Sequence, residues 1–289
     1  MQTVKTISAL RAELAPWRVK GERIAFVPTM GNLHAGHLKL VQIAKKQAKR
    51  VVVSIFVNPL QFGPKEDFAS YPCTFDEDSR ILSENGVDML FAPELAEMYP
   101  DGLDASAKVE VPGMSDIFCG ASRPGHFRGA ATVVNKLFNI VQPDLAVFGE
   151  KDYQQLLIIR RMVKDLAVPI EIVGVPTVRE PDGLAMSSRN GYLSAEERRQ
   201  APQLYQALCA VRYQLMKNKG HDFAAAEEVG LVWLRNAGLR PDYLTVCRTR
   251  DLGPAGAGDR DVVILAAAWL GTTRLIDNLQ VTLQGDPQS

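Results

Sequence analysis

The sequence predicts an α/β fold in which a doubly wound parallel sheet is followed by a smaller C-terminal α+β domain. Short β-branched runs alternate with helical patterns up to Pro176, and this alternation is typical of βαβ units in a parallel sheet. Beyond Pro176 the order changes, because two helical patterns are followed by three consecutive strand patterns. We therefore expect residues 1–176 to form the domain that carries the sheet and residues 177–289 to form a second domain.

Each element of the first domain follows from its local pattern. Apolar, β-branched runs predict strands at residues 23–28, 51–57, 87–92, 145–148 and 170–176. Helical patterns between them predict helices at residues 36–50, 131–141 and 153–166. A further helix is expected to begin at Thr74-Phe-Asp-Glu77, which matches a capping box, and to end at Asn85-Gly86. This alternation implies right-handed crossovers and a Rossmann-like sheet.

The second domain begins with another capping box, Ser194-Ala-Glu-Glu197. The box predicts the start of a long helix that continues towards Lys217, with a light break at Pro202. A second helix is expected at residues 223–236. Strand patterns follow at residues 243–247, 261–268 and 273–277. Helices followed by consecutive strands indicate a small α+β unit.

The composition argues against several classes of protein. The chain of 289 residues carries 33 basic and 33 acidic side chains, and zero net charge disfavours a protein that coats nucleic acid or an anionic membrane. Its longest apolar run has nine residues, against the roughly 20 that a membrane-spanning helix needs. Residues 1–14 show no apolar stretch of signal-peptide length, so we expect a cytoplasmic protein. The four scattered cysteines favour reduced thiols over a disulfide framework.

A segment rich in glycine and histidine stands where the first strand turns into the first helix, at Pro28-Thr-Met-Gly-Asn-Leu-His-Ala-Gly-His37. The carboxyl ends of parallel strands and the helix N-termini after them form the ligand crevice of an open α/β sheet. Gly31 and Gly36 permit close approach of the backbone to a ligand. His34 and His37 lie on one helix face if the first turn includes both, and they are candidate donors to phosphate oxygens.

Two alternatives to a phosphate site stay open for this histidine pair. One exposed and one core histidine is the ordinary outcome for an arbitrary His-x-x-His pair. A zinc site is the second alternative, but it needs a third ligand, and only His126 and His221 remain among the histidines.

Two later segments also carry groups suited to phosphate. The first, Phe148-Gly-Glu-Lys-Asp-Tyr-Gln-Gln155, lies at a strand-to-helix junction where Lys151 could face a triphosphate. A polar turn with Asp152 as an ordinary N-cap is an equal alternative there. The second, Gly183-Leu-Ala-Met-Ser-Ser-Arg-Asn190, places two hydroxyls beside a guanidinium, and these groups bind phosphate without a metal. As an isolated motif, it is also a common loop before a helix.

Together these segments resemble the pantothenate synthetase (pantoate-beta-alanine ligase) family of the nucleotidyltransferase superfamily, which carries HxGH and KMSKS-like motifs. The resemblance covers nearly the whole chain through the ordered runs PTMGNLHAGH, SIFVNPLQF, YPCTFDED, ASRPGHFRGAATVV, FGEKDYQQ, VGVPTVRE, GLAMSSRNGYLS and AAWLGTTRLIDN. The ordered series is far more specific than any one motif. The KMSKS-like element is Met186-Ser187-Ser188-Arg189, with Arg189 where relatives in the superfamily have a lysine.

The resemblance implies an ATP-dependent ligase of pantothenate and coenzyme A biosynthesis. The carboxylate of (R)-pantoate would attack the α-phosphate of ATP, which gives pantoyl adenylate and diphosphate. The amine of beta-alanine would then attack the acyl carbon and release AMP and pantothenate. Such chemistry depends mainly on positioning and on stabilisation of developing charge.

The resemblance also assigns roles to residues. It makes His37 the proton donor, with stabilisation by hydrogen bonding alone as the alternative, and it makes His34 and Lys151 the other catalytic residues. Gln61 and Gln155 would bind the pantoate hydroxyls, and Gln61 would also contact beta-alanine. The residues expected around ATP are Met30, Gly31, Asn32, Leu33, His34, Ala35, Gly36, His37, Gly149, Glu150, Lys151, Asp152, Val178, Met186, Ser187, Ser188 and Arg189. The apolar walls for pantoate are expected at Pro28, Met30 and Phe56, and weaker candidates around the substrates are Asn58, Arg123 and His126.

Further expectations concern the metal, the assembly and the second domain. Mg²⁺ is expected with ATP; its protein ligands are unknown, and Asp76, Glu77 and Asp78 are the candidates, although a capping box is the better explanation of Glu77. The resemblance suggests a homodimer formed through the first domain, and the second domain would form a lid over the nucleotide. The expected partners are the small-molecule substrates, with no nucleic acid and no membrane.

Three other functions compete with this hypothesis. A simple adenylyltransferase shares the HxGH motif and the sheet, but it needs neither the two glutamines nor a second domain of this size. A nucleic-acid-binding module is the second, because the HxGH and KMSKS-like motifs also occur in class I aminoacyl-tRNA synthetases. The zero net charge disfavours it. A catalytically silent relative is the third, but each chemical position named above retains the expected residue type.

Overall fold

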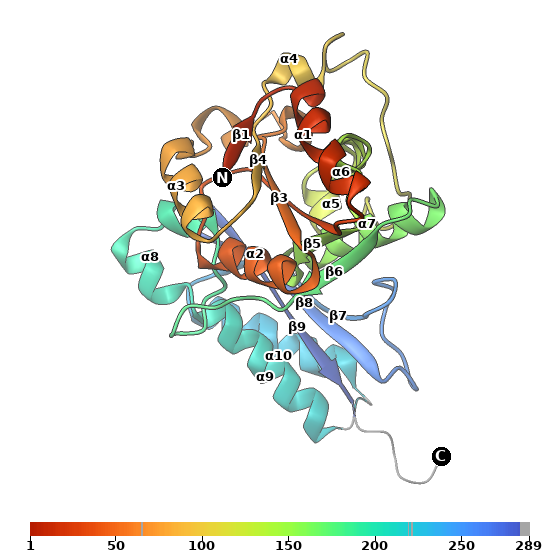
Figure 1. Cartoon of the computed structure of the whole chain (residues 1–289). Helices are drawn as coiled ribbons and strands as arrows, with labels where there is room; N and C mark the ends of the chain where they lie inside the picture. The colour runs from red at the N-terminus through yellow and green to blue at the C-terminus, as the bar shows by residue number, and fades with distance from the viewer. Residues whose placement is uncertain (65, 219, 221, 284–289) are drawn as a thin grey trace. The chain divides into compact units, whose positions relative to one another are not determined.

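Figure 1 shows the computed structural model, which describes residues 1–64, 66–218, 220 and 222–283. His221, one of the histidines considered as a zinc ligand, lies outside the described residues. The chain divides into two compact units, and the first contains Met1–Glu150 and Gln155–Pro176. The second contains the chain from Thr177 onward together with Lys151–Gln154, which the sequence patterns place with the sheet. The chain therefore passes between units within the junction that contains Lys151.

The first unit is built on a six-stranded sheet in which all neighbouring strands are parallel. The strands are β1 (Gln2–Val4), β2 (Ile24–Thr29), β3 (Arg50–Ile55), β4 (Met89–Phe91), β5 (Leu145–Gly149) and β6 (Glu171–Val175). Their spatial order is β1-β4-β3-β2-β5-β6, so the order reverses between β2 and β5. This topology confirms the predicted doubly wound, Rossmann-like sheet.

Helices cover both faces of this sheet (Figure 1). The helices and 3-10 turns are α1 (Ile7–Val19), α2 (Ala35–Gln47), η1 (Pro59–Gln61), η2 (Asp67–Ser70), α3 (Phe75–Glu84), α4 (Leu95–Met98), α5 (Cys119–Ser122), α6 (His126–Val141), η3 (Glu150–Asp152) and α7 (Tyr153–Asp165). On one face, Val41 of α2 and Leu82 of α3 join a buried cluster with strand side chains. On the other, Phe138 of α6 packs edge-on against Phe26 and Phe148, with ring centroids 6.5 and 6.3 Å apart. The central strands are therefore buried on both sides, as their apolar runs predict.

The capping box predicted for the first unit is wrong, and the predicted set of helices and strands is incomplete. Thr74 is the N-cap of α3, but its side chain makes no capping hydrogen bond, because its backbone (φ −119°, ψ 42°) lies outside the extended region. The carboxylate of Glu77 pairs with Arg80 at 2.6 Å instead. The sequence patterns do not predict β1 and α1, and α6 begins at His126 rather than at residue 131.

The second unit packs helices on one face of a three-stranded antiparallel sheet with the order β7-β8-β9 (Figure 1). Its elements are η4 (Ser188–Tyr192), α8 (Ala195–Gln200), α9 (Gln203–Lys217), α10 (Phe223–Asn236), β7 (Arg240–Arg248), β8 (Asp261–Leu270) and β9 (Thr273–Thr282). Alternate β8 residues such as Val262 and Ile264 share a buried cluster with Leu208 of α9 and Leu234 of α10. This arrangement confirms the smaller α+β unit.

The helical region of this unit confirms one prediction and corrects another. The N–H of Glu197 donates to Oγ of Ser194, and the carboxylate of Glu197 accepts the N–H of Ser194 at 2.8 Å, which completes the predicted capping box. The single helix predicted up to Lys217 is instead two helices, α8 and α9. They separate at Ala201-Pro202, because proline has no N–H to continue the hydrogen-bond ladder.

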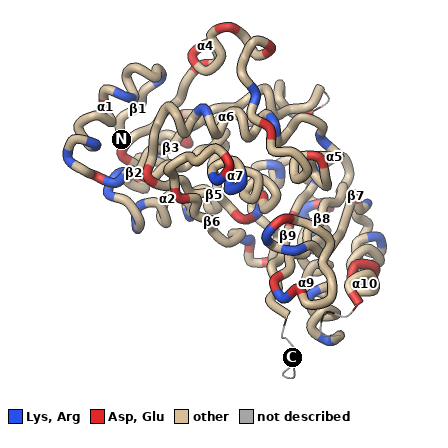
Figure 2. The backbone as a smooth tube through the Cα atoms, turned by 90° about the vertical axis from the view of Figure 1, so that its right-hand side faces the viewer, with Lys and Arg blue, Asp and Glu red and all other residues tan. Residues whose placement is uncertain are grey.

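Basic and acidic residues are interleaved along the tube of each unit (Figure 2). The balance of charge in the composition is thus also a local balance. Among the residues that the structure describes, no helix is long and apolar enough to cross a membrane.

Candidate active site

Three loops of the first unit leave the sheet beside the point where the strand order reverses. In the sheet, β2 lies between β3 and β5, and all three strands are parallel, so their carboxyl ends share one edge. Residues 30–34 connect β2 to α2, residues 56–58 connect β3 to η1, and Glu150 follows β5 as the first residue of η3. Ligands of open α/β sheets bind at this edge. The fold therefore brings the predicted HxGH segment and Gln61 to one edge of the sheet.

His34 and His37 cap helix α2 reciprocally. The N–H of Gly36 donates to Nδ1 of His34 at 3.1 Å, and the N–H of His34 donates to Nδ1 of His37 at 3.3 Å. Both Nδ1 atoms act as acceptors, so each neutral ring carries its proton on Nε2. The ring centroids lie 4.2 Å apart at the positive end of the α2 dipole. His34 is the extended N-cap residue and not part of the first helical turn, a detail that the spacing does not predict.

Asp78, on α3, anchors the loop that precedes these histidines. Its carboxylate is buried, with 1 % exposure, and accepts the N–H groups of Asn32 and Leu33, each at 2.8 Å. The hydroxyl of Thr74 also donates to it, at 3.1 Å. At Gly31 (φ 84°), a Cβ would lie 3.1 Å from this carboxylate in a left-handed backbone, so the position favours glycine. Asp78, a predicted candidate for Mg²⁺, therefore uses its oxygens to hold a loop.

Gln61 lies in η1 and is held through both its side chain and its backbone. Its amide Nε2 donates to the sulfur of Met30 at 2.8 Å. Its backbone carbonyl lies 3.3 Å from the guanidinium of Arg123 and 2.7 Å from Nδ1 of His126, and both side chains come from the α5–α6 region. Gln61 is 8 % exposed, so its side chain is mostly enclosed. The structure thus gathers the weaker candidates Arg123 and His126 around a predicted substrate glutamine.

Asn58 immediately precedes η1, the turn that carries Gln61, and is 1 % exposed. Its amide nitrogen donates to the carbonyl of Gly129 at 3.1 Å, and its Oδ1 accepts the Tyr99 hydroxyl at 2.8 Å. Burial raises the pKa of Tyr99 to about 12, so the phenol keeps its proton and remains a donor at neutral pH. A Cβ at Gly129 would lie 2.1 Å from the carbonyl oxygen of Leu60, so glycine there lets α6 approach η1.

Arg123, which contacts the backbone of Gln61, also forms an ion pair with Glu66. The guanidinium of Arg123 contacts the carboxylate of Glu66 at 2.7 Å, with both side chains about four-fifths buried. Burial acts to raise the pKa of Glu66, but the hydrogen bonds and charge of Arg123 outweigh it and hold the pKa below its ordinary value. The pair is therefore ionised at neutral pH, and it orients Arg123 beside Gln61.

The predicted segment Phe148–Gln155 is divided between the two units. Gly149 ends β5, where a Cβ would meet nothing within 4 Å. Lys151 and Asp152 belong to the second unit, and their charged groups are 3.8 Å apart. Gln155 is partly buried in the first turn of α7, in the first unit. Gln155 therefore shares a unit with Gln61, whereas Lys151 shares one with the KMSKS-like segment.

The KMSKS-like segment follows a short hairpin in the second unit. The N–H of Met186 donates to the carbonyl of Val178 at 3.0 Å, so the backbone of Val178, a residue expected around ATP, pairs within the hairpin. Oγ of Ser187 then accepts the N–H of Arg189 at 3.3 Å and caps the turn η4. Residues 187–189 are partly exposed. The hydroxyls and the guanidinium thus stand together on one capped turn.

A cavity of about 270 Å³ opens beside the loop after β2. It is lined by Met30, Gly31, Ile55, Phe56, Val57, Pro59, Phe68, Pro72, Cys73, Thr74, Phe75, Asp78, Pro93 and Leu95. Met30 and Phe56 are predicted walls for pantoate, but within the described chain neither Gln61 nor Gln155 lines this cavity. Buried hydroxyls of pantoate need polar partners, so we do not assign the cavity to that substrate.

Several residues that organise the site are not apparent from local patterns. Asp78, Arg179 and Asp277 each hold a predicted ATP-binding segment through contacts distant in sequence. The one available signal is their presence in the runs YPCTFDED, VGVPTVRE and AAWLGTTRLIDN. Within the described ranges, no three His, Cys, Asp or Glu side chains are placed to hold a metal ion.

Comparisons with known proteins match the chain over nearly its whole length. The model of the pantoate-beta-alanine ligase family matches residues 2–280. Pantothenate synthetases of Pseudomonas putida (strain W619) and Thioalkalivibrio sulfidiphilus (strain HL-EbGR7) are each 58% identical to the chain. Each alignment covers 98% of this chain, and 98% and 99% of the respective relative.

Solved structures show the same likeness. The crystal structure of pantothenate synthetase from Thermus thermophilus is 50% identical, with a TM-score of 0.90 over 96% of this chain and 99% of that one. The pantoate-beta-alanine ligase from Francisella tularensis, complexed with beta-gamma ATP and beta-alanine, is 35% identical, with a TM-score of 0.81 over 96% and 97% of the two chains. From the full-length match, the shared fold and the ordered motifs, we conclude that the chain belongs to the pantoate-beta-alanine ligase family.

Proposed function

We propose that the residues described above carry out the reaction of the family, the ATP-dependent condensation of (R)-pantoate with beta-alanine. The products are pantothenate, AMP and diphosphate, and the intermediate is pantoyl adenylate. The observation that carries the assignment of roles is the reciprocal capping of His34 and His37, which fixes two Nε2–H donors at the ligand-binding edge of the sheet.

In the first step, the pantoate carboxylate attacks the α-phosphate and diphosphate leaves. Negative charge grows on the phosphate oxygens, so donors fixed in advance stabilise the transition state without reorganisation. We assign this role to the Nε2–H groups of His34 and His37. His37, which the resemblance makes the proton donor, would act as a neutral ring through its hydrogen bond to the developing charge. The backbone of Gly31 to Leu33, held by Asp78, allows the phosphates to approach closely.

The second unit supplies the remaining charge. The ammonium of Lys151, the hydroxyls of Ser187 and Ser188 and the guanidinium of Arg189 would contact the triphosphate. Closure of this unit as a lid over the nucleotide stays a prediction from the sequence.

The two glutamines fit the polar groups of pantoate. Gln61 is enclosed, so an amide there that loses its partner costs about 1–3 kcal/mol, and this penalty favours ligands with matching hydroxyls. Gln155, on α7, supplies the second amide. Around Gln61, we place Arg123 and His126 near beta-alanine, whose carboxylate would attract the guanidinium.

Mg²⁺ is expected to arrive with ATP, and the partners of two of the three candidate acidic residues on α3 argue against protein ligands there. Glu77 is paired with Arg80, and Asp78 holds a loop. We therefore propose that ATP phosphates and water hold the ion. A cytoplasmic homodimer is a further proposal from the sequence, and sedimentation of the purified chain tests the dimer.

The proposed function is tested by incubating the purified chain with ATP, (R)-pantoate and beta-alanine and quantifying the products by chromatography. We expect one AMP for each pantothenate. Omission of beta-alanine should stop AMP release but leave diphosphate formation dependent on pantoate. ATP cleavage that ignores both organic substrates would identify a different nucleotidyl transfer.

A further inference from the structure

The run AAWLGTTRLIDN is part of the family resemblance but has no role in the reaction described above. Its last two residues, Asp277 and Asn278, lie on β9 and are both buried, with exposures of 3 % and 5 %. Buried polar side chains are retained only when their hydrogen bonds are satisfied. The partners of these two residues therefore indicate what the run does.

Asp277 forms a bidentate ion pair with Arg179. The guanidinium nitrogens lie 2.6 and 2.9 Å from the two carboxylate oxygens, and such two-point pairing adds geometric specificity. Burial raises the pKa of Asp277 above its ordinary value, and the hydrogen bonds and charge of Arg179, together with the charge of Lys151, oppose this rise. Both cations are thus within electrostatic reach of one carboxylate.

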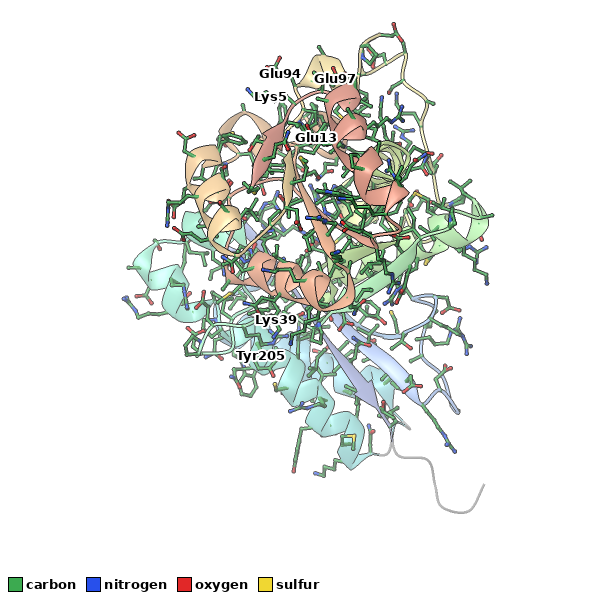
Figure 3. The ribbon with its side chains drawn as sticks, in the orientation of Figure 1. Lys5, Glu13, Lys39, Glu94, Glu97 and Tyr205 are labelled. Carbon is green, nitrogen blue, oxygen red and sulfur yellow. The ribbon has the colours of Figure 1, made fainter. Side chains whose placement is uncertain are left out.

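Arg179 connects this carboxylate to the hairpin that carries the KMSKS-like segment. Its guanidinium donates to the carbonyls of Gly183 and Asn278, each at 3.1 Å. It also stacks 3.8 Å from the ring centroid of Tyr205, a residue of α9 labelled in Figure 3. At Gly183 (φ 94°), a Cβ would lie 2.6 Å from the same ring, so the hairpin turn requires glycine there.

Asn278 connects the same network to the Lys151 segment. Its side-chain nitrogen donates to the backbone carbonyl of Lys151 at 2.9 Å. Lys151 lies 127 positions away in sequence, and Lys151–Gln154 is the short stretch that leaves the first unit to join the second. One side chain therefore fixes the main chain at the residue proposed to face the triphosphate.

We infer that Arg179, Asp277 and Asn278 are positioning residues that hold Lys151 and the Met186–Arg189 segment in one fixed arrangement. The inference rests on the proposed function, in which both segments bind ATP phosphates. None of the three network residues needs to touch ATP. The network sets where the Lys151 ammonium lies relative to the hydroxyls and the guanidinium of the capped turn.

A double-mutant cycle tests the inference, with Lys151→Ala, Asn278→Ala and the double variant. The readout is pantoate-dependent exchange of labelled diphosphate into ATP, measured against ATP and against pantoate. Asn278→Ala should lower kcat/KM for ATP by about tenfold, the effect of one lost hydrogen bond, and leave the KM for pantoate unchanged. In the Lys151→Ala background it should cause no further loss, because the ammonium that it positions is absent.

Two more variants separate positioning from general stability. Arg179→Lys keeps the charge but cannot form the bidentate pair and both carbonyl contacts, so it should reproduce the kinetic signature of Asn278→Ala. Arg274→Met is the matched control, because the ion pair of Arg274 with Asp242 (2.7 Å) joins β9 to β7 in the same unit. It should lower Tm without changing kcat/KM for ATP.

The outcomes are distinguishable. Wild-type exchange by Lys151→Ala overturns the proposed role of Lys151 and the inference with it. If Lys151→Ala lowers kcat/KM for ATP, two results for Asn278→Ala overturn the inference alone. The first is a fall that adds to the fall caused by Lys151→Ala, and the second is no fall at all. A uniform fall in both kinetic parameters that tracks Tm would also overturn it, because that pattern indicates a structural defect.

Discussion

A single buried aspartate organises the proposed phosphate-binding segments in each unit, but the two aspartates act differently. Asp78 accepts the backbone N–H groups of the loop before His34 directly. Asp277 accepts the guanidinium of Arg179, which in turn holds the hairpin before Met186. Direct anchoring suits one loop that must be fixed against one helix. Indirect anchoring through Arg179 suits segments that come from separate parts of the chain.

The chemical difference predicts a difference in sensitivity. Asp78 satisfies neutral donors, and losing its charge weakens hydrogen bonds without leaving a cation uncompensated. Asp277 neutralises a guanidinium that is itself mostly buried, with 17% of its side chain exposed. Removing one partner of a buried ion pair costs far more than the pair contributes, because the other charge remains without compensation. Substitution of Asp277 should therefore lower the free energy of unfolding more than substitution of Asp78.

The largest effect is expected for Asp277→Asn. The substitution leaves Arg179 without a counter-charge, so the free energy of unfolding should fall by about 3–5 kcal/mol. Urea unfolding measures this, and hydrogen exchange should localise the loss to β9. The control Glu228→Gln removes a solvent-exposed ion pair with Arg235 in the same unit and should cost about 0–1 kcal/mol. Equal losses in the two variants would contradict the comparison.

A smaller effect is expected for Asp78→Asn. The amide turns a donor group towards one of two backbone N–H groups, so the loss should be about 1.5–3 kcal/mol, the range for hydrogen bonds to a charged group. The rate of pantoate-dependent diphosphate exchange should fall as the loop relaxes. Asp76→Asn, at an exposed position of the same helix, is the control and should change neither quantity. Wild-type stability of Asp78→Asn would show that the loop needs no anchor.

The smallest effect is expected for a carboxylate away from both anchors. Hydrogen bonds from Lys49 and Arg50 lower the pKa of Glu22 from 4.5 to about 2. Because the folded pKa lies below the unfolded one, the stabilisation is complete above pH 4.5 and is lost as pH falls towards 2. The stability difference between wild type and Glu22→Gln should therefore shrink over this range. A difference that does not depend on pH would show that the carboxylate pKa is not lowered.

Much of the fold could be predicted because local patterns determine it. Buried runs such as residues 51–57 have no polar face, which is typical of a central parallel strand. The two capping boxes show the limit of this reasoning. Ser194 has the extended backbone that a cap requires, whereas Thr74 does not, and Arg80 competes for Glu77. A motif of four residues cannot reveal either the dihedral angles or the competitor.

The candidate site divides in the same way. The residues proposed to face the ligands, among them His37, Gln61 and Lys151, could be named from the sequence because they lie in motifs that resemble a known family. The residues that position them could not, because Asp78 acts across 46 sequence positions and Asp277 across 98. Contacts of that range depend on the packed fold and leave no periodic signal. For the same reason, the sequence does not predict that Lys151 belongs to the second unit.

The most direct test of the account is pantoate-dependent exchange of labelled diphosphate into ATP, without beta-alanine, by wild type and by His37→Ala. Wild type should exchange label only when pantoate is present. His37→Ala should still fold, with Tm lowered only by the loss of one capping hydrogen bond, and it should lose exchange by a factor of about 10²–10³, the cost of removing one donor to developing charge. Exchange without pantoate, or undiminished exchange by His37→Ala, would contradict the account.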